Sequence, residues 1–414
     1  MNILTYLPIE GLKMGCDRGA MRQRCADGSW KAKTWADFST DVERAAAAFV
    51  SLGIKPGDKV GMFSANCMEA VVMDFAAYAN RAVPVSIYST SSTDQVRYIA
   101  DDASIRILFV GDQSQYESAL KVAESVESIM MIVAIGDVKL NGDSKSSISF
   151  DNFLSIGDKA SDECKKEIVK RRAESADDDV ATLIYTSGTT GEPKGAILPQ
   201  SAFNAMFKMH DERLTMISDR DTSLSYLPMS HIFEKAWVYF CMHRGILVNI
   251  NPNPRDIEAA LRETRPSCMC SVPRFWEKIY SVIDGKLASY GLFKKLLFKR
   301  AIAVGRKRNL EYVRFGKKVP WMLAIEYSFF KNQVFDPVKK VIGVENGNIY
   351  PTAGAPLSPQ IAEFFRACGI PVLIGYGLSE TTAPVTCWQQ EGYAIGSVGT
   401  PLPGVEVKIS DDGE

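Results

Sequence analysis

The feature that most constrains the fold is a regular alternation of strand and helix patterns in the first part of the chain. Short apolar runs predict strands at residues 59–63, 82–87 and 106–110. Helical patterns flank them at residues 34–52, with an alanine-rich part at 42–52, and at residues 68–80 and 94–101. Such alternation is typical of a parallel, doubly wound sheet with helices on its faces. The sequence therefore predicts an α/β fold.

Length and charge narrow the class of protein. At 414 residues the chain is longer than one hydrophobic core usually fills, so two or more lobes are expected. Its 48 Lys and Arg residues nearly balance its 49 Asp and Glu residues, so no chain-wide field recruits nucleic acid. Asp74 interrupts the apolar run at 70–79, and no run approaches the ~20 apolar residues of a membrane-spanning helix.

The cysteines and histidines indicate neither a disulfide framework nor a metal centre. The nine cysteines are odd in number and scattered, and Cys268 and Cys270 form a lone C-x-C. With only three histidines the spacing offers no zinc set. Free thiols in a reducing cytoplasm are the expectation.

The strongest chemical signal is the segment 185–195, Tyr-Thr-Ser-Gly-Thr-Thr-Gly-Glu-Pro-Lys-Gly, which follows an apolar strand pattern at 180–184. Glycines let backbone N–H groups approach an anion, hydroxyls donate further hydrogen bonds, and Lys194 supplies positive charge. Pro193 stands where a Walker A loop needs glycine. A flexible surface turn is the alternative, but the density of glycine and hydroxyl groups favours a phosphate-binding loop.

This loop resembles the phosphate-binding signature of the adenylate-forming superfamily, which includes acyl-CoA synthetases, luciferases and peptide-synthetase adenylation domains. Three further segments resemble later motifs of that family in the same order: Tyr226–His231, Gly375–Thr382 and Gly399–Gly404. The resemblance covers essentially the whole chain. It implies two parallel-sheet lobes in an αβαβα arrangement, with a small, incomplete β-barrel formed by the last ~70 residues.

The resemblance implies a role in ATP binding for several of these residues. Tyr376 matches the ring that stacks on adenine, and stacking suits a flat base. The other residues expected near adenine are Gly354, Ala355, Pro356, Gly375 and Gly377. The phosphates are expected to contact Thr186, Ser187, Gly188, Thr189, Thr190, Gly191, Lys194 and Ser379. Small residues at 352–356 also fit a tight turn before a helix at Ser358.

The same family resemblance implies which residues bind magnesium and which take part in catalysis. Glu380 resembles the carboxylate that binds Mg²⁺, with Thr186 as the second protein contact, and hard dications bind in this way. The substrate carboxylate itself attacks the α-phosphorus in this family, so no protein nucleophile is expected. Catalysis then consists of positioning and charge neutralisation. The residues expected to take part are Thr186, Lys194, His231 and Glu380.

His231 matches a family residue that lies beside the reacting carboxylate and moves when the thiol arrives. A structural, hydrogen-bonded histidine is the alternative. Phe233, Trp237 and Phe240 follow at i, i+4 and i+7 spacing on one predicted helix face. These side chains either line an acyl tunnel, with His231, Phe233 and Trp237 contacting the acyl chain, or form ordinary core.

Two features resemble the long-chain fatty acid–CoA ligase branch. The run Ser271–Tyr280, Ser-Val-Pro-Arg-Phe-Trp-Glu-Lys-Ile-Tyr, is typical of it, as is a largely helical insertion at 281–346. The basic, amphipathic segment 292–308 within that insertion either contacts an anionic membrane surface or packs on its own domain. ATP, Mg²⁺, coenzyme A and a long-chain fatty acid are the implied ligands.

The expected subdivisions are 1–177, 178–345 and 346–414 of one AMP-binding N-terminal domain. The family's ribose-binding aspartate, hinge and lysine-bearing C-terminal lid have no counterpart in this sequence, so a truncated, weakly active form is expected. The alternating run at 405–410 predicts a half-buried strand. The polar stretch 141–147 is expected to form a surface loop, and the highly charged stretch 161–179 is expected to end as a linker into the next strand. Alternative functions are a fatty acyl-AMP ligase that delivers to a carrier protein, and a non-catalytic ATP- or acyl-binding module.

Overall fold

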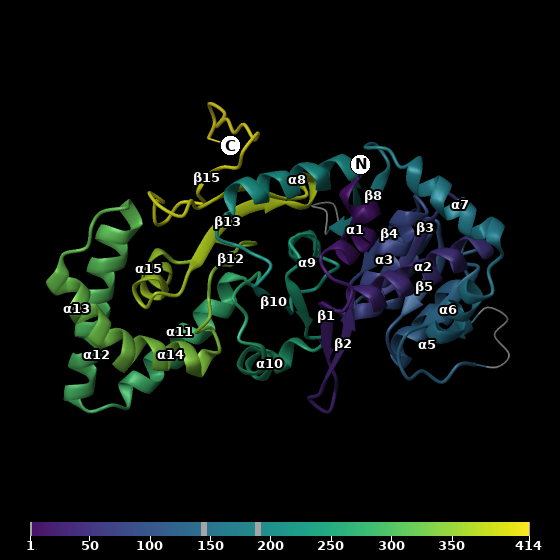
Figure 1. Cartoon of the computed structure of the whole chain (residues 1–414). Helices are drawn as coiled ribbons and strands as arrows, with labels where there is room; N and C mark the ends of the chain where they lie inside the picture. Colours follow the sequence, from purple (N-terminus) through teal and green to yellow (C-terminus); the bar gives the residue numbers. More distant parts are fainter. Residues whose placement is uncertain (1, 142–146, 187–191, 414) are drawn as a thin grey trace. The chain divides into compact units, whose positions relative to one another are not determined.

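The structure is a computed structural model that describes residues 2–141, 147–186 and 192–413. The chain forms two compact units, and each is interrupted in sequence by the other. Unit 1 comprises Met1–Lys208 and Ser225–Pro254, and unit 2 comprises Met209–Leu224 and Arg255–Glu414. Figure 1 shows the elements of both units.

Unit 1 combines parallel strands with helices. Its helices are α1 Ile3–Lys13, α2 Trp35–Ser51, α3 Met68–Ala79, α4 Thr93–Asp102, α5 Gln113–Ala123, α6 Phe150–Asp158, α7 Asp162–Ala173 and α9 Ile232–His243, and α8 Gln200–Arg213 runs across the unit boundary. Its strands are β1 Gly19–Arg24, β2 Trp30–Thr34, β3 Lys59–Phe63, β4 Val83–Ile87, β5 Ile105–Val110, β6 Met131–Ala134, β7 Ser147–Ser149, β8 Val180–Thr186, β9 Lys194–Pro199 and β11 Leu247–Ile250. The short strand β10, Thr222–Ser225, also spans the boundary.

The main sheet of unit 1 has seven strands in the order β7-β6-β5-β3-β4-β8-β9. Every neighbouring pair is parallel except β8 and β9, which are antiparallel. The central strand β3 pairs with β4 on one side and with β5 on the other. The predicted parallel α/β sheet is therefore confirmed.

Both faces of this sheet are covered by helices, as the side chains of β5 show. Leu108 belongs to an apolar cluster with α4 and α5 residues, including Val96. The next residue, Phe109, contacts Phe49 of α2 and Phe153 of α6 through edge-to-face rings. Successive strand residues point to opposite faces, so β5 is buried on both sides, as strands of parallel sheets usually are.

A second sheet of unit 1 places β1 between β11 and β2, parallel to β11 and antiparallel to β2. Helix α3 contacts both β4 of the main sheet and β1 of the second sheet. The helix therefore lies between two sheets, in the layered arrangement that the family resemblance implies.

Most predicted elements in residues 34–110 match the structure closely. Helix α2 begins after Thr34, whose hydroxyl accepts a hydrogen bond from the Asp37 backbone N–H in a capping box. Gly53 follows the helix with φ +77°, which places it in the left-handed conformation expected after a helix end. The polar stretch expected as a loop at 141–147 falls mostly outside the described residues.

The charged segment 161–179 was expected to end as a linker, but much of it is helix α7. Ser161 caps this helix by accepting a hydrogen bond from the Cys164 backbone N–H. Its inner face includes Arg171 and Arg172, which are 9% and 7% exposed. Because that face consists partly of arginines, its apolar pattern is too weak to reveal the helix.

Unit 2 combines short strands with a helical insertion. Its helices are α10 Ile257–Thr264, α11 Pro273–Ala288, α12 Leu292–Arg306, α13 Trp321–Phe330, α14 Asp336–Ile342 and α15 Pro359–Ala367, with short 3₁₀ or π turns at η1 Pro254–Asp256, η2 Lys307–Tyr312, η3 Val313–Phe315, η4 Lys331–Phe335 and η5 Ser379–Thr381. Its strands are β12 Tyr350–Thr352, β13 Val372–Leu378, β14 Ala383–Cys387 and β15 Thr400–Pro401. The insertion expected at 281–346 is indeed largely helical (Figure 1).

The strands of unit 2 form one sheet in the order β12-β13-β14-β15. The β12–β13 pair is parallel, and the following pairs are antiparallel. Arg213 donates hydrogen bonds to the carbonyl oxygens of Cys387 (3.1 Å) and Pro401 (2.7 Å), which link β14 to β15. Among the described residues these strands form an open ribbon and no closed barrel.

The prediction of a half-buried strand at 405–410 is wrong. No strand is formed there, and Val407 and Ile409 are 49% and 67% exposed. The alternation of side chains is present, but no described strand pairs with this segment. An alternating sequence does not by itself form a strand, because the backbone N–H and C=O groups of a strand need a partner strand to hydrogen-bond with.

A buried ion pair joins α3 to α9 inside unit 1. Lys235 of α9 donates to Asp74 of α3, and Tyr239 also donates to Asp74. Lys235 and Asp74 are 1% and 5% exposed. Tyr78 donates to the Tyr239 hydroxyl (3.4 Å). Burial and the nearby Asp74 carboxylate raise the pKa of Tyr239 well above its ordinary value, so the phenol remains a donor.

We expect Asp74→Leu and Lys235→Met each to lower the free energy of unfolding by about 3–5 kcal/mol, because each leaves one charge buried without its partner. The double variant should recover most of the loss, because two apolar side chains need no counter-charge. Urea unfolding followed by circular dichroism measures the three values. Additive losses in the double variant would contradict the argument.

Candidate functional site

The phosphate-loop candidate of unit 1 is the connection of a β-hairpin. Strands β8 and β9 are antiparallel, and Thr186 lies opposite Lys194 in the register. Lys194 is exposed and Thr186 is half-buried. Helix α8 begins only after β9, at Gln200. The loop therefore does not open directly into a helix, so any phosphate affinity depends on its backbone N–H groups, hydroxyls and Lys194.

Two residues brace the base of this hairpin. Tyr185 is 5% exposed and donates a hydrogen bond from its hydroxyl to Asp102 of α4. Burial raises the pKa of Tyr185 above its ordinary value. A Cβ on Gly195 would lie 3.1 Å from the Tyr185 ring, so a larger residue there requires the ring to shift by a few tenths of an ångström. The predicted contacts Ser187, Gly188, Thr189, Thr190 and Gly191 lie outside the described residues.

Asn66 holds the segment that leads to His231. Its amide Nδ2 donates to the Leu227 carbonyl (2.7 Å), and its Oδ1 accepts from the Met229 backbone N–H (2.8 Å). Asn66 lies just after β3, at the carboxyl end of that strand. The sequence analysis did not single out Asn66. Its position in a polar stretch after a predicted strand was the available signal, because ligands of parallel sheets bind at carboxyl ends of strands.

His231 occupies the N-cap position of α9, with its backbone carbonyl accepting from Lys235 N–H (3.1 Å). Its imidazole ring lies edge-to-face with Tyr88, with 5.8 Å between ring centroids. Tyr88 directly follows β4 and was also missed by the sequence analysis. The side chain of His231 is exposed at the surface of unit 1, but nearby protein atoms partly remove water from the imidazole ring. This desolvation lowers the pKa of His231 and favours a neutral imidazole.

These residues share one edge of the main sheet. Val85 and Ser86 of β4 pair with Leu183 and Ile184 of β8 in parallel register. Tyr88 and Thr186 each lie two residues beyond a paired residue, so both emerge at the carboxyl edge. Phosphate-loop and His231 candidates of unit 1 are thereby brought to the same end of the sheet, where parallel α/β sheets hold ligands.

The aromatic residues of α9 differ in burial. Phe233 is half-buried, whereas Trp237 and Phe240 are 3% and 0% exposed, with their rings 5.8 Å apart. Trp237 and Phe240 thus contribute to the core. The alternative of an acyl tunnel stays a prediction.

Glu234 lies in the same turn of α9 and is 0% exposed. Neither carboxyl oxygen has a well-aligned hydrogen-bond partner among the described residues. Burial raises the pKa of Glu234 to about 8, an effect that Ser225 and the Tyr226 backbone only partly offset. The carboxyl group is therefore protonated at neutral pH, one turn from the imidazole-bearing N-cap.

In unit 2, β13 carries the adenine candidates. Gly375, Tyr376 and Gly377 lie in its second half, and the Tyr376 side chain is 46% exposed. The ring is therefore available for stacking on a flat base. A Cβ on Gly377 would lie 1.4 Å from the Ala383 carbonyl oxygen, so the close approach of β14 requires glycine at this position.

The turn at Gly354, Ala355 and Pro356 follows β12, which is parallel to β13. Thr352 pairs with Ile374, so the turn leaves the sheet beside the segment that begins at Gly375. All three turn residues are exposed, and Gly354 has φ +89°. The expected tight turn before the helix beginning after Ser358 is confirmed, and it lies where a ligand of Tyr376 could contact backbone.

Ser379 and Glu380 belong to η5, immediately after β13. The hydroxyl of Thr381 donates to the Leu378 carbonyl and accepts from the Leu378 N–H, each at 3.0 Å, and so fixes this turn. Glu380 is exposed and forms no ion pair within the described ranges. An exposed carboxylate of this kind suits a hard cation that arrives with phosphate ligands.

A buried hydrogen-bond network anchors the end of β12. Trp276 of α11 donates its indole N–H to the hydroxyl oxygens of Ser271 (2.8 Å) and Thr352 (2.9 Å). The Ser271 and Thr352 hydroxyls also contact one another at 2.8 Å. Trp276 is fully buried. The run Ser271–Tyr280 thus has a structural role, because it positions the turn that follows Thr352.

The sequence pattern of the AMP-binding enzyme family matches residues 12–414. The chain belongs to this family. The long-chain-fatty-acid–CoA ligase FadD15 of Mycobacterium bovis is 31% identical over 395 residues, which cover 95% of this chain and 63% of that protein. The peroxisomal long chain acyl-CoA synthetase 7 of Arabidopsis thaliana is 27% identical over 394 residues, covering 93% and 53%. This family member therefore spans less than two thirds of the length of these relatives.

Solved structures show the same fold. The anthranilate CoA ligase AuaEII in complex with anthranoyl-AMP has a TM-score of 0.73 and 17% identity, covering 99% of this chain and 67% of that one. The N-terminal domain of FACL13 from Mycobacterium tuberculosis has a TM-score of 0.69 and 19% identity, covering 100% and 86%. The predicted adenylate-forming N-terminal domain fold is confirmed.

Glu234 gives the folded protein a defined pH dependence. Its folded pKa of about 8 lies above the ordinary 4.5, so the folded state holds a proton that the unfolded chain releases. The contribution of Glu234 to the free energy of unfolding is fully present below pH 4.5 and is lost as the pH rises toward 8. Relative to Glu234→Gln, the wild-type free energy of unfolding should fall by up to about 1.4 kcal/mol per pH unit in that window.

Urea unfolding of both proteins at pH 5, 6, 7 and 8 measures this difference. The exposed Glu127 on the loop after α5 supplies the control, since Glu127→Gln should leave the pH profile of the wild type unchanged. Parallel profiles for wild type and Glu234→Gln would show that the buried carboxyl group is not protonated.

Proposed function

We propose that this chain carries out the ATP-dependent activation of a long-chain fatty acid as the nucleotide-binding part of a long-chain fatty acid–CoA ligase. The observation that carries the proposal is the pairing of Thr186 with Lys194 at the mouth of a glycine- and hydroxyl-rich hairpin, in a chain that also exposes Tyr376 and Glu380. The identity to acyl-CoA ligases supports the choice of substrate class.

The first step of the proposed reaction forms an acyl-adenylate. A carboxylate oxygen of the fatty acid attacks the α-phosphorus of ATP, the bond to the bridging oxygen breaks, and pyrophosphate leaves. Thr186 and Lys194, with residues 187–191, are assigned to the phosphates, and Ser379 to the α-phosphate. Tyr376 is assigned to the adenine, together with Gly375, Gly377 and the turn 354–356.

The second step transfers the acyl group to coenzyme A. The thiol loses its proton to solvent, its sulfur attacks the acyl carbonyl carbon, and AMP leaves with the electron pair of the broken C–O bond. His231 is assigned to the acyl carboxylate, and a neutral imidazole, favoured by its lowered pKa, can accept or donate one hydrogen bond there. Phe233 and Trp237 are assigned to the acyl chain. A cytoplasmic location suits the ATP and coenzyme A that the reaction consumes.

Magnesium fits the donor chemistry of the assigned residues. Glu380 offers one carboxylate and Thr186 one hydroxyl, and Mg²⁺ commonly binds through one or two protein oxygens together with substrate phosphates. Bound there, the ion would neutralise charge on the leaving pyrophosphate. No cluster of three or more His, Cys, Asp or Glu side chains capable of holding a metal occurs in the described part of the chain.

We expect Lys194→Ala combined with Thr189→Ala to weaken ATP binding at least about 100-fold, because hydrogen bonds to charged groups contribute about 1.5–3 kcal/mol each. Tyr376→Ala should weaken it by about tenfold or more through lost stacking. Isothermal titration with ATP and Mg²⁺ measures both effects.

Matched controls are an exposed lysine and an exposed tyrosine outside the motifs. Lys208→Ala on α8 and Tyr290→Ala after α11 should leave ATP affinity unchanged, since Lys208 is exposed and Tyr290 is 45% exposed. Unchanged ATP affinity in folded Lys194→Ala/Thr189→Ala and Tyr376→Ala proteins would refute the assignment.

We further propose that α12 contacts an anionic membrane surface, where a fatty acid substrate would be found. Leu292, Phe293 and Leu296 of this helix are 80%, 78% and 64% exposed. The segment 292–308 has seven basic residues and no acidic one, and the neighbouring α13 exposes Trp321 at 73%. Exposed apolar side chains among one-signed charges suit the interface of an anionic bilayer. No helix in the described ranges has the length and hydrophobicity to cross a membrane.

Sedimentation with vesicles tests this contact. Binding should be strong on vesicles rich in phosphatidylglycerol at low salt, weak on phosphatidylcholine alone, and reduced by added salt that screens charges beyond ~10 Å at 0.1 M. Leu296→Ser should weaken binding, whereas Val169→Ser on α7, at the same 64% exposure, should not. Absence of binding to anionic vesicles at low salt would remove the proposal.

A further inference from the structure

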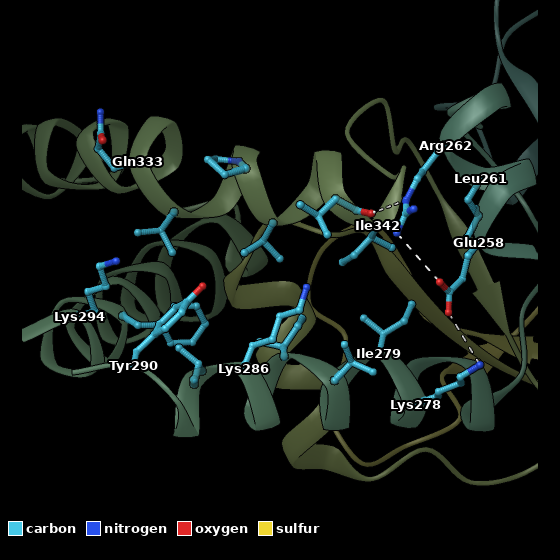
Figure 2. A pocket seen from close by; sticks show the side chains of 18 of the residues that line it. Glu258, Leu261, Arg262, Lys278, Ile279, Lys286, Tyr290, Lys294, Gln333 and Ile342 are labelled. Carbon is cyan, nitrogen blue, oxygen red and sulfur yellow. Dashed lines mark hydrogen bonds and ion pairs between the residues drawn. The ribbon is translucent and has the colours of Figure 1, made fainter. Parts of the chain in front are cut away.

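The helical insertion of unit 2 contains a cavity that the proposed reaction does not use. Its volume is about 600 Å³, within the range of about 300–1,000 Å³ typical of small-ligand sites. Helices α10, α11, α12 and α14 and the turn η4 surround it (Figure 2). None of the residues assigned to ATP or to the acyl carboxylate lines it.

One wall is an apolar stripe along α11. Phe275, Ile279, Ile283 and Leu287 recur every four residues, which places them on one helix face, and Tyr290 lines the cavity just after the helix ends. This face borders the cavity. Val282, on the same stripe, is 51% exposed.

The opposite wall comes from η4 and α14. Val334, Val338, Val341 and Ile342 line it, and Val341 is 56% exposed. Two apolar walls therefore face one another across a space that side chains leave open. Such a space favours an apolar occupant, because filling it removes apolar surface from water. A long, slender group fits the length of the α11 stripe.

The charges around the cavity are unevenly balanced. At one end Glu258 lies 4.0 Å from Arg262 and 3.9 Å from Lys278, so both cations at that end already have an acidic neighbour (Figure 2). Further along α11, Lys286 also lines the cavity, and no carboxylate in the described part of the chain pairs with it. Lys294 of α12 lies over the Tyr290 ring at 5.3 Å.

We propose that this cavity binds a long-chain fatty acid as a free carboxylate, with its alkyl chain between α11 and α14. The carboxylate would lie at Lys286, with Lys294 adding positive charge near the same end. An apolar groove with cations that lack acidic partners complements an anionic amphiphile better than a neutral or cationic one. The site binds the substrate class of the proposed function but is separate from the residues assigned to the reaction.

The chemistry of the groove separates this site from the membrane contact. Leu292, Phe293 and Leu296 on α12 do not line the cavity, whereas Leu297 and Phe298 do. A membrane contact needs an extended anionic surface, but a groove of this size needs only one dissolved amphiphile. Binding should therefore occur without vesicles and without ATP, which makes its test independent of the proposed reaction.

Titration calorimetry with monomeric decanoate and dodecanoate, without ATP, tests the site. Each added CH₂ should increase affinity by up to about fourfold, the ratio that corresponds to burying one methylene. Dodecyltrimethylammonium should bind at least about tenfold more weakly than dodecanoate, because its charge opposes Lys286 and Lys294. Equal binding of the cationic and anionic amphiphiles would overturn the head-group assignment.

Variants localise the binding. Lys286→Glu should weaken dodecanoate binding about tenfold or more, and Val338→Trp should abolish it by filling the groove. Lys340→Glu on α14, an exposed lysine that does not line the cavity, is the matched control and should bind as the wild type does. Because a second fatty acid can bind elsewhere in the chain, the site must also be mapped directly.

Photolabelling supplies that map. A fatty acid with a diazirine in its alkyl chain should label residues 275–290 and 333–342, and excess dodecanoate should compete. Label confined to other segments, or label in these segments that Val338→Trp does not reduce, would refute the site. Label found only when vesicles are present would assign the groove to membrane lipid and overturn the proposal of a free carboxylate.

Discussion

The buried pair of Asp74 and Lys235 is the interaction on which the candidate site of unit 1 depends. Asp74 lies on α3, whose position is set by the strands β3 and β4 that precede and follow it. Lys235 lies one turn inside α9, so the pair fixes the start of the helix that presents His231. Apolar residues in both positions would pack equally well, since buried ion pairs rarely add net stability. A charged pair, however, is costly to separate, and it therefore disfavours sliding or rotation of α9 along α3.

The carboxyl edge of the main sheet then gathers side chains that are distant in sequence. Asn66 follows β3, Tyr88 follows β4 and Thr186 ends β8, and each emerges where its strand ends. Asn66 adds a second constraint on the segment before His231 through its two hydrogen bonds to Leu227 and Met229. The parallel register of β4 and β8 therefore fixes where the chain enters the phosphate loop at Thr186. The ion pair fixes the start of α9 in the same sense. Both devices place residues of the candidate site on rigid elements.

The sequence predicted those parts of the fold whose pattern is local. Strand β3 was predicted with its observed bounds, and α3 and β5 to within one residue, because each has an unbroken apolar run or periodicity. Helix α7 was not predicted, because its buried Arg171 depends on groups distant in sequence, the Ile54 carbonyl and the Asn80 side chain, in addition to Glu167 one turn earlier. The prediction of a strand at 405–410 was wrong for a related reason. The alternation of side chains is local, but a strand also needs a partner strand that can be distant in sequence. The motif residues could likewise be named from local sequence. Asn66 and Tyr88 could be recognised as neighbours of the candidate site only from the structure, which brings the ends of β3, β4 and β8 to one edge of the sheet.

The insertion of unit 2 is rich in basic and apolar residues and has two physically different surfaces, the exposed face of α12 and the cavity along α11. On α12 the exposed Leu292 and Phe293 stand among lysines and arginines that remain in water, so any attraction there is a sum over many screened charges. Along α11 the apolar residues border a concave space, and Lys286 stands beside it without an acidic partner in the described residues. An ion pair formed there would be less hydrated and less sensitive to salt than one on the open helix. Salt dependence therefore distinguishes the two surfaces even where the same amphiphile interacts with both, because screening weakens the first far more than the second.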